Sequence, residues 1–212
     1  AYLTYAPDIA KNYEVGVKGI LFDRRLQFSG DIYRINLSNF QFNATSPSSF
    51  PLVYNGSEAQ SRGAELELTG RVTPALTVNF GYTYTDAKVK KALEIYDLPV
   101  AALFSSPAAE PILNISLPAG ARLPGVSRST VNLGADYVVL FGSNDRSVTL
   151  HADGSYASAQ DGAINPASTY FWIIPERYLV NLRISYEVGK QWGADLFARN
   201  VTNDPGYSGG FN

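Results

Sequence analysis

The sequence predicts an all-β protein that crosses a membrane as an antiparallel, up-and-down β-barrel. Three observations support this fold class. Segments of about ten residues alternate strictly between apolar and polar side chains, as strands with one apolar face do. The connections between these segments alternate in length, first short and then long. Charged residues make up only 17% of the chain and aromatic residues 13%, whereas soluble proteins average roughly 25% charged residues.

Composition also excludes several classes of protein. The formal net charge is -2 with both signs interspersed, so no basic field is present to attract nucleic acid. Cysteine is absent, which excludes disulfides and thiolate metal sites. No apolar run approaches the roughly 18 residues of a membrane-spanning helix, so any crossing is made by strands. The chain has no Met, and we expect it to be an internal segment of a longer protein.

The first predicted hairpin joins residues 12–23 (NYEVGVKGILFD) to residues 26–37 (LQFSGDIYRINL). Both segments place apolar side chains at alternate positions over most of their length. A short turn at Asp23, Arg24 and Arg25 separates them, which is the spacing of an antiparallel hairpin.

The second predicted hairpin follows a long polar connection at residues 40–54. Its first strand ends the stretch 55–68 (NGSEAQSRGAELEL), where apolar residues after Gly63 alternate with Glu65 and Glu67. This strand therefore has one apolar face and one carboxylate face. The turn lies at Thr73 and Pro74, and the partner strand covers residues 76–85.

Four further strands complete the predicted pattern of eight. The longest connection, residues 87–125, precedes them, and another long one covers residues 159–177. Loops longer than about 15 residues count against a compact soluble domain unless they have a function of their own. The predicted strands are residues 129–141, 148–156, 178–188 and 191–200, with short turns at residues 142–145 and at Gly189 and Lys190.

The two faces of these strands suit a bilayer and a lumen. Strands of about ten residues are long enough to cross a hydrocarbon core of about 30 Å, and lipid tolerates strands only in a closed cylinder. Tyrosine and tryptophan near the ends of the apolar face are typical of interfacial girdles. These aromatic positions are Tyr13, Tyr82, Tyr84, Tyr137, Tyr156, Tyr186 and Trp192; the face predicted to line the lumen carries Glu65, Glu67, Asn79, Asp136, Asp153, Arg183 and Asp195.

Four segments, in this order and spacing, resemble the C-terminal barrel of TonB-dependent outer-membrane receptors: YEVGVKG (13–19), NGSEAQSRGAELEL (55–68), LPGVSRSTVNLGADY (123–137) and FARNVTND (197–204). The resemblance extends over nearly the whole chain. It implies that residues 1–212 supply eight strands, the fourteenth to the twenty-first, of a 22-stranded barrel with a plugged lumen. We expect the plug with its TonB-contacting segment, the earlier strands and the closing strand to lie outside this sequence.

Enzyme and metal sites are poorly supported by the residues. His151 shares a predicted strand face with Asp153 and Ser155, which suggests a hydrolase triad. A triad requires hydrogen-bond reach of about 3 Å, whereas neighbours on one strand face are about 7 Å apart. Glu65 and Glu67 suggest a cation site, yet one strand supplies too few oxygens for calcium. We expect all of these residues to face the lumen, with no catalytic, metal or cofactor site.

Side chains on the long loops are better candidates for ligand contact. Loops at one rim of a barrel meet an arriving ligand first, and aromatic side chains provide large contact areas. The competing interpretation is that these aromatics pack their own loops or lie at lipid headgroups. The candidates are Tyr96, Phe104, Asn114, Tyr170 and Trp172, with Phe171, Asn43, Gln160 and Asn165 as further loop residues of the same kind.

The resemblance implies an active-transport receptor in the outer membrane of a Gram-negative bacterium. It would import a scarce nutrient, such as a ferric siderophore, a cobalamin or a carbohydrate, and perform no chemistry on it. The expected partners are outer-membrane lipids, a small-molecule or metal-chelate ligand, and the TonB complex acting on the plug.

Two alternatives stay open at this point. One is a self-contained eight-stranded barrel, such as an adhesin, a small pore or a lipid-modifying enzyme. The other is a soluble, lectin-like β-sandwich, against which the regular phase of short turns and long loops counts.

Overall fold

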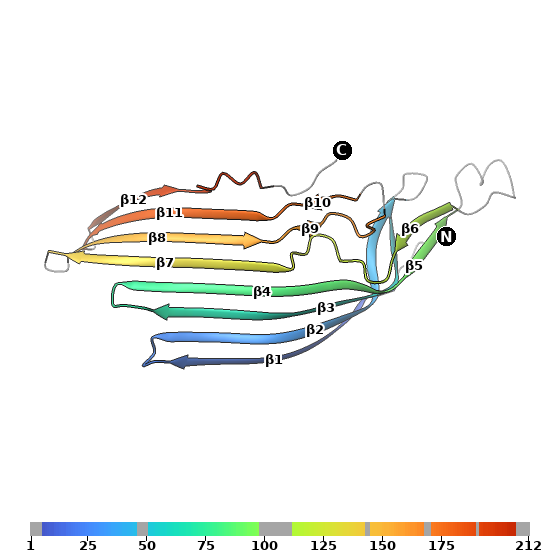
Figure 1. The fold of residues 1–212 in the computed structure, drawn as a ribbon, viewed down its shortest axis with the longest axis horizontal. Coiled ribbons are helices and arrows are strands. Elements are labelled where there is room, and N and C mark those ends of the chain that lie inside the picture. Colours follow the sequence, from blue (N-terminus) through green and yellow to red (C-terminus); the bar gives the residue numbers. More distant parts are fainter. Residues whose placement is uncertain are drawn as a thin grey trace.

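Eight long strands form one curved antiparallel sheet in the order β1-β2-β3-β4-β7-β8-β11-β12, as Figure 1 shows. The computed structural model describes residues 6–45, 51–97, 112–142, 145–167, 171–189 and 191–206. Within these ranges there is no helix that could cross a membrane. The eight strands are β1 (Ile9–Leu21), β2 (Leu26–Thr45), β3 (Pro51–Arg71), β4 (Leu76–Lys91), β7 (Ser129–Phe141), β8 (Arg146–Ala157), β11 (Arg177–Val188) and β12 (Trp192–Ala198).

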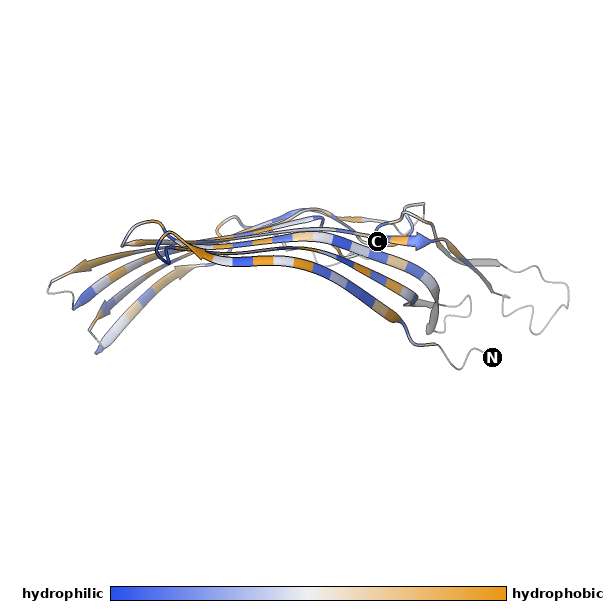
Figure 2. Ribbon diagram, turned by 90° about the horizontal axis from the view of Figure 1, so that it is seen from below, coloured by the Kyte–Doolittle hydropathy of each residue, from blue (hydrophilic) through white to orange (hydrophobic). Residues whose placement is uncertain are grey.

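The strand register brings the apolar residues together on one face. Phe28 pairs with Leu68, Leu68 with Phe80, Phe80 with Leu133, and Leu133 with Gly154. These residues form a row across five strands, and Leu133 is 52% exposed. Hydrophobic and hydrophilic residues alternate along the strands in Figure 2. An exposed, continuous apolar face on a sheet is the surface that a barrel presents to lipid, and we call it the lipid face.

Aromatic rings mark both ends of the lipid face. At the end with the long connections, the rings of Tyr156 and Tyr178 lie 4.9 Å apart between centroids. At the opposite end, Tyr186 lies 5.4 Å from Trp192 and 6.1 Å from Phe141. Aromatic residues at these two levels match the girdles of an outer-membrane barrel.

Short turns join the strands at one end of the sheet, on the left of Figure 1. Between β1 and β2, three successive residues, Phe22, Asp23 and Arg24, have φ of 53, 52 and 65°. The N–H of Arg25 donates to the carbonyl of Phe22 over 3.0 Å. This tight reversal confirms the predicted turn and fixes the register of the first hairpin.

The long connections lie at the predicted end but contain more strand structure than the sequence predicted. β2 and β3 continue through most of the connection predicted at residues 40–54, with irregular pairing between Ser38 and Phe42. β4 continues to Lys91. Within the remaining connections, β5 (Leu93–Asp97) pairs with β6 (Ile112–Leu117), and β9 (Gln160–Asp161) pairs with β10 (Ile173–Ile174).

The strands are longer than predicted because backbone pairing can continue beyond the edge of the bilayer. Beyond the membrane both faces of a strand meet water or other loops, so the apolar-polar alternation that predicts a strand is lost. The backbone hydrogen bonds of β2 and β3 persist there without that signal.

The sheet is open, because β1 and β12 lie at its two opposite edges. A self-contained eight-stranded barrel would require these two strands to pair. A sandwich would require a second sheet over the apolar face, and the two further sheets in the described ranges are two-stranded hairpins. The architecture is therefore a curved segment of a barrel wall, with its polar face toward a lumen.

Candidate ligand-binding rim and lumen wall

The rim at the long-loop end has a small core of its own. After β6 the chain turns back along β4, where Val89 donates its N–H to the carbonyl of Ala121 over 2.8 Å. Leu123 donates its N–H to the carbonyl of Ala87 over 3.0 Å. Val89 and Leu117 are each only 1% exposed. This segment is thus fastened to β4 rather than lying free above the barrel.

Polar contacts connect the same segment to β9. Arg122 forms an ion pair with Asp161 at 3.4 Å, and the carbonyl of Asp161 accepts the N–H of Gly125 at 2.9 Å. The amide of Gln160 donates to the hydroxyl of Ser127 over 2.7 Å. The amide of Gln160 thus helps to hold the rim together, and contact between Gln160 and a ligand remains a prediction.

Trp172 packs against its own hairpin. Its indole lies directly over Gly162, where an added Cβ would collide with the ring, and its carbonyl accepts the N–H of Gly162 at 2.9 Å. Its Nε1 is buried without a hydrogen-bond partner in the described part of the chain. This geometry matches the competing interpretation from the sequence, in which a loop aromatic packs against its own loop. Contact between Trp172 and a ligand remains a prediction.

The other predicted ligand contacts are located only in part. Tyr96 lies in β5 and pairs with Leu113 in β6, and Asn114 is the next residue of β6. Both belong to a hairpin that stands at the rim in Figure 1. Phe104 and Tyr170 lie outside the described residues.

A polar network crosses four segments of the lumen wall. Asp136 on β7 contacts Nδ1 of His151 on β8 at 2.7 Å, and Asp153 contacts Nε2 at 3.2 Å. Asn181 on β11 donates to Asp153 over 2.8 Å and accepts the N–H of Asn200 at 2.9 Å. The network therefore links β7, β8, β11 and the segment that follows β12.

The expectation that His151 could not reach its neighbour on the same strand was wrong. Strand spacing separates backbones, but the imidazole and carboxylate lean together and close the gap to 3.2 Å. Since both ring nitrogens face carboxylate oxygens, only the doubly protonated imidazolium donates to both. Ser155 takes no part in this described network, so the triad geometry is not formed.

Two pockets lie on the lumen side, away from the rim candidates. One, of about 350 Å³, is lined by residues of the network together with Arg183, Asp195, Phe197 and Arg199. Arg199 lies over the ring of Phe197, 5.1 Å from its centroid. Mixed charges of this kind produce a hydrated, polar wall.

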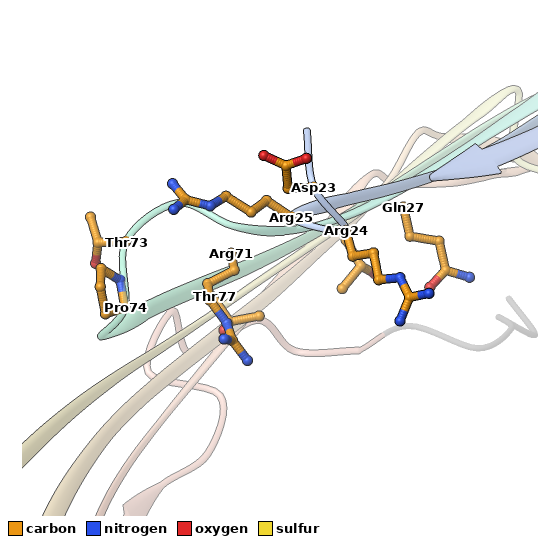
Figure 3. Close-up of a pocket in the computed structure, with 9 residues that line it drawn as sticks. Asp23, Arg24, Arg25, Gln27, Arg71, Thr73, Pro74 and Thr77 are labelled. Atoms are coloured by element: carbon orange, nitrogen blue, oxygen red, sulfur yellow. The ribbon is translucent and has the colours of Figure 1, made fainter. Parts of the chain in front are cut away.

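The second pocket, of about 520 Å³, lies at the short-turn end between the first two hairpins. Figure 3 shows Arg24, Arg25 and Arg71 around it, with Asp23 at the β1–β2 turn. Gln27, Thr69 and Thr77 lie on the polar face of their strands and contribute to its lining. The pocket belongs to the lumen side of the barrel's short-turn end.

Sequence reasoning missed the compact turn that ends β12. Asn200 and Asn203 have φ of 50 and 53°, and Asn200 accepts the N–H of Asp204 at 2.9 Å. Asp204 in turn accepts the N–H groups of Tyr178 and Gly206, which hold the pKa of Asp204 below its usual 3.8. The strand stops at Ala198 rather than at residue 200 for this reason. The spacing of Asn and Asp in NVTND is typical of side-chain-capped turns and could have revealed it.

Comparison with known proteins identifies the family. The model of the TonB dependent receptor-like β-barrel matches residues 3–203. The ferrichrome outer membrane transporter/phage receptor of Escherichia coli (strain K12) is 37% identical over 84 residues, which are 40% of this chain and 11% of that protein. The ferripyoverdine receptor of Pseudomonas aeruginosa is 33% identical over 85 residues, 37% of this chain and 10% of that protein. The matched part is therefore about a tenth of either relative.

Solved structures share the fold over almost the whole chain. The siderophore receptor PiuA from Acinetobacter baumannii superposes with a TM-score of 0.67 at 22% identity, covering 91% of this chain and 24% of that one. The ferric yersiniabactin uptake receptor FyuA from Yersinia pestis gives 0.67 at 12% identity, covering 93% and 25%. The open sheet thus corresponds to about a quarter of such receptors. With eight antiparallel strands, an exposed lipid face, a polar lumen wall and a family match from residue 3 to 203, the chain belongs to the TonB dependent receptor-like β-barrel family and forms part of an outer-membrane barrel wall.

Proposed function

We propose that the receptor containing this chain imports a ferric siderophore across the outer membrane. The observation that carries this proposal is the family match over residues 3–203, combined with relatives that are receptors for ferrichrome, ferripyoverdine and ferrioxamine B. Among the nutrients considered from the sequence, ferric siderophores have this support, whereas cobalamin and carbohydrates have only the general family resemblance.

The rim supports a role in capture. The β9 hairpin and the segment following β6 are fastened together through Arg122, Asp161 and Gln160. Side chains on such a fixed scaffold lose little conformational entropy when a ligand binds. We propose Tyr96, Phe104, Asn114, Tyr170 and Trp172 as ligand-contacting residues, with aromatic faces for apolar parts of the chelate and an amide for its polar groups.

The lumen wall supports transport with a plug. Asp31 on β2 lies directly opposite Glu65 on β3, and like charges in that arrangement are unfavourable. Neither carboxylate has an ion pair within the part of the chain that the structure describes. We propose that basic groups of a plug domain balance them and that the TonB complex acts on that plug to open the path.

Radioactive iron uptake by the intact receptor tests the proposal. The receptor is expressed in an iron-limited strain lacking its own siderophore receptors, and hydroxamate, catecholate and mixed-ligand ferric complexes are supplied in turn. We expect uptake of one ligand class that disappears in a matched strain without TonB.

Failure of every ferric complex, with restored growth on cobalamin or an oligosaccharide, would contradict the choice of ligand. Uptake that persists without TonB would contradict the proposed energy source. A variant with Trp172→Ala that assembles normally and transports with unchanged affinity would remove that residue from the ligand site.

A further inference from the structure

The outer face of the barrel wall changes from apolar to charged side chains between two successive rows of residues. Ile32, Ala64 and Tyr84 lie side by side as a row of the lipid face on β2, β3 and β4. One step further from the short turns, the same face carries Arg34, which pairs with Arg62. The register then continues the polar zone on the same face with Asp86, Lys88, Gln60, Asn36 and Lys11.

Four cations of this zone, Lys11, Arg34, Arg62 and Lys88, come from four adjacent strands, and we call them the basic belt. Asp86 is the one carboxylate within their two rows. The next carboxylate on this face, Glu58, lies one row further from the membrane. The belt therefore has an excess of positive charge directly beyond the apolar surface.

Contacts within the zone hold several of these groups in place. Asp86 is 6% exposed and lies 3.2 Å from Arg62 and 2.9 Å from Lys88, whereas the Arg62 side chain is 64% exposed. Asn36 accepts a hydrogen bond from Arg34 over 3.1 Å. Arg34 has no carboxylate partner among the described residues. Guanidinium groups thus remain available on the outer surface although their positions are constrained.

The position of the belt selects its partner. Cationic side chains at the edge of a bilayer extend along apolar surface and place their charge among the headgroups. Clusters of lysine and arginine at that level bind anionic lipids, and the guanidinium fork matches phosphate oxygens. The outer leaflet of a Gram-negative outer membrane is formed mainly by lipopolysaccharide, whose lipid A anchor carries phosphates.

We propose that the basic belt on β1 to β4 binds the phosphate groups of lipid A in the outer leaflet. The site lies on the outside of the barrel and is independent of the ligand that passes through the lumen. An experiment can therefore refute lipid A binding without refuting the proposed transport function, and the reverse also holds.

Native mass spectrometry of the intact receptor, in neutral micelles doped with diphosphoryl lipid A, measures the retained lipid. The double variant Lys11→Gln/Arg34→Gln leaves the contacts of Asp86 intact and removes two charges. We expect it to bind lipid A about thirtyfold more weakly, since each interfacial cation contributes about 1 kcal/mol. The matched control is Arg24→Gln/Arg25→Gln, which removes two charges from exposed arginines at the opposite end and should bind as wild type does.

Two further measurements sharpen the result. Arg34→Lys/Arg62→Lys keeps the charge but loses the fork, and it should fall between wild type and the double variant. Lipid A without phosphates should not be retained by any form.

Equal retention by wild type and Lys11→Gln/Arg34→Gln, with assembly verified by gel mobility before and after heating, would overturn the proposal. Equal competition by phosphatidylglycerol would overturn the assignment to lipid A. Unchanged siderophore uptake by the double variant is expected and leaves the transport proposal untouched.

Discussion

Asp86 shows how one residue organises the outer end of two strands. Burial alone would raise its pKa, but the hydrogen bonds and charges of Lys88 and Arg62 outweigh burial and hold the pKa of Asp86 below 3.8. A carboxyl group with a depressed folded-state pKa stabilises the fold at every pH above its unfolded pKa. That contribution is lost as the pH falls through the folded pKa.

We therefore expect Asp86→Asn to destabilise the assembled receptor at pH 7. The expected loss is only about 1 kcal/mol, because the partners of Asp86 are partly exposed and solvent screens their charges. The difference from wild type should persist down to about pH 4 and shrink below it, where the wild-type carboxylate becomes protonated. Urea midpoints in lipid vesicles measure both effects. Asp8→Asn, an exposed aspartate before β1, is the control; an equal loss in that variant would refute a specific role for Asp86.

At the scale of elements, the sequence predicts what the bilayer dictates. Residues such as Leu133 and Asn132 alternate because one meets lipid and the other the lumen, so all eight strands of the sheet could be predicted with their faces. β5, β6, β9 and β10 could not, since strands outside the bilayer lack that alternation. The packing of Trp172 on Gly162 and the pairing of Asp136 with His151 depend on register and loop closure, which local sequence patterns do not encode.

The β9–β10 hairpin offers a direct test of that packing. Gly162→Ala adds a Cβ where the Trp172 ring now lies, so the indole must leave its site. In an intact receptor in which every other tryptophan, Trp192 included, is replaced by phenylalanine, we expect a red shift of the Trp172 emission. If Trp172 also contacts the proposed siderophore ligand, Gly162→Ala and Trp172→Ala should each weaken its binding by about 1 to 3 kcal/mol.

Gly154→Ala is the matched control, because its nearest atoms are 3.5 Å from the added Cβ. It should leave both emission and affinity unchanged. An unshifted spectrum for Gly162→Ala would show that Trp172 does not occupy the position described above.

For the molecule as a whole, the decisive property is that the two faces of one sheet meet different solvents. Its apolar side is exposed along the full set of strands, and its polar side carries the network around His151. A soluble domain would bury the first and expose the second. The open edges at β1 and β12 expose backbone groups that lipid does not tolerate unpaired, so further strands must complete the wall around the lumen.

Substitutions at two neighbouring positions test which face of β7 meets lipid and which meets the lumen. Leu133→Arg places a charge on the lipid face and should cost about 2 to 4 kcal/mol if it lies near the bilayer midplane, whereas Asn132→Arg points into the lumen and should be mild. The fraction of receptor that assembles in outer membranes compares the two variants. Similar assembly of both would contradict the facing of β7 and with it the barrel.

The long β2–β3 pair determines how far the rim stands above the last apolar row. From Ile32, at the last apolar row, to Ser38, where the pairing with β3 becomes irregular, a strand rising about 3.3 Å per residue extends roughly 20 Å. Even when tilted, this part of the pair raises the rim above the last apolar row before β2 and β3 bend, as Figure 1 shows. Under the proposed function, a ferric chelate would first meet this protein wall above the lipid, and its path toward the lumen would begin along protein.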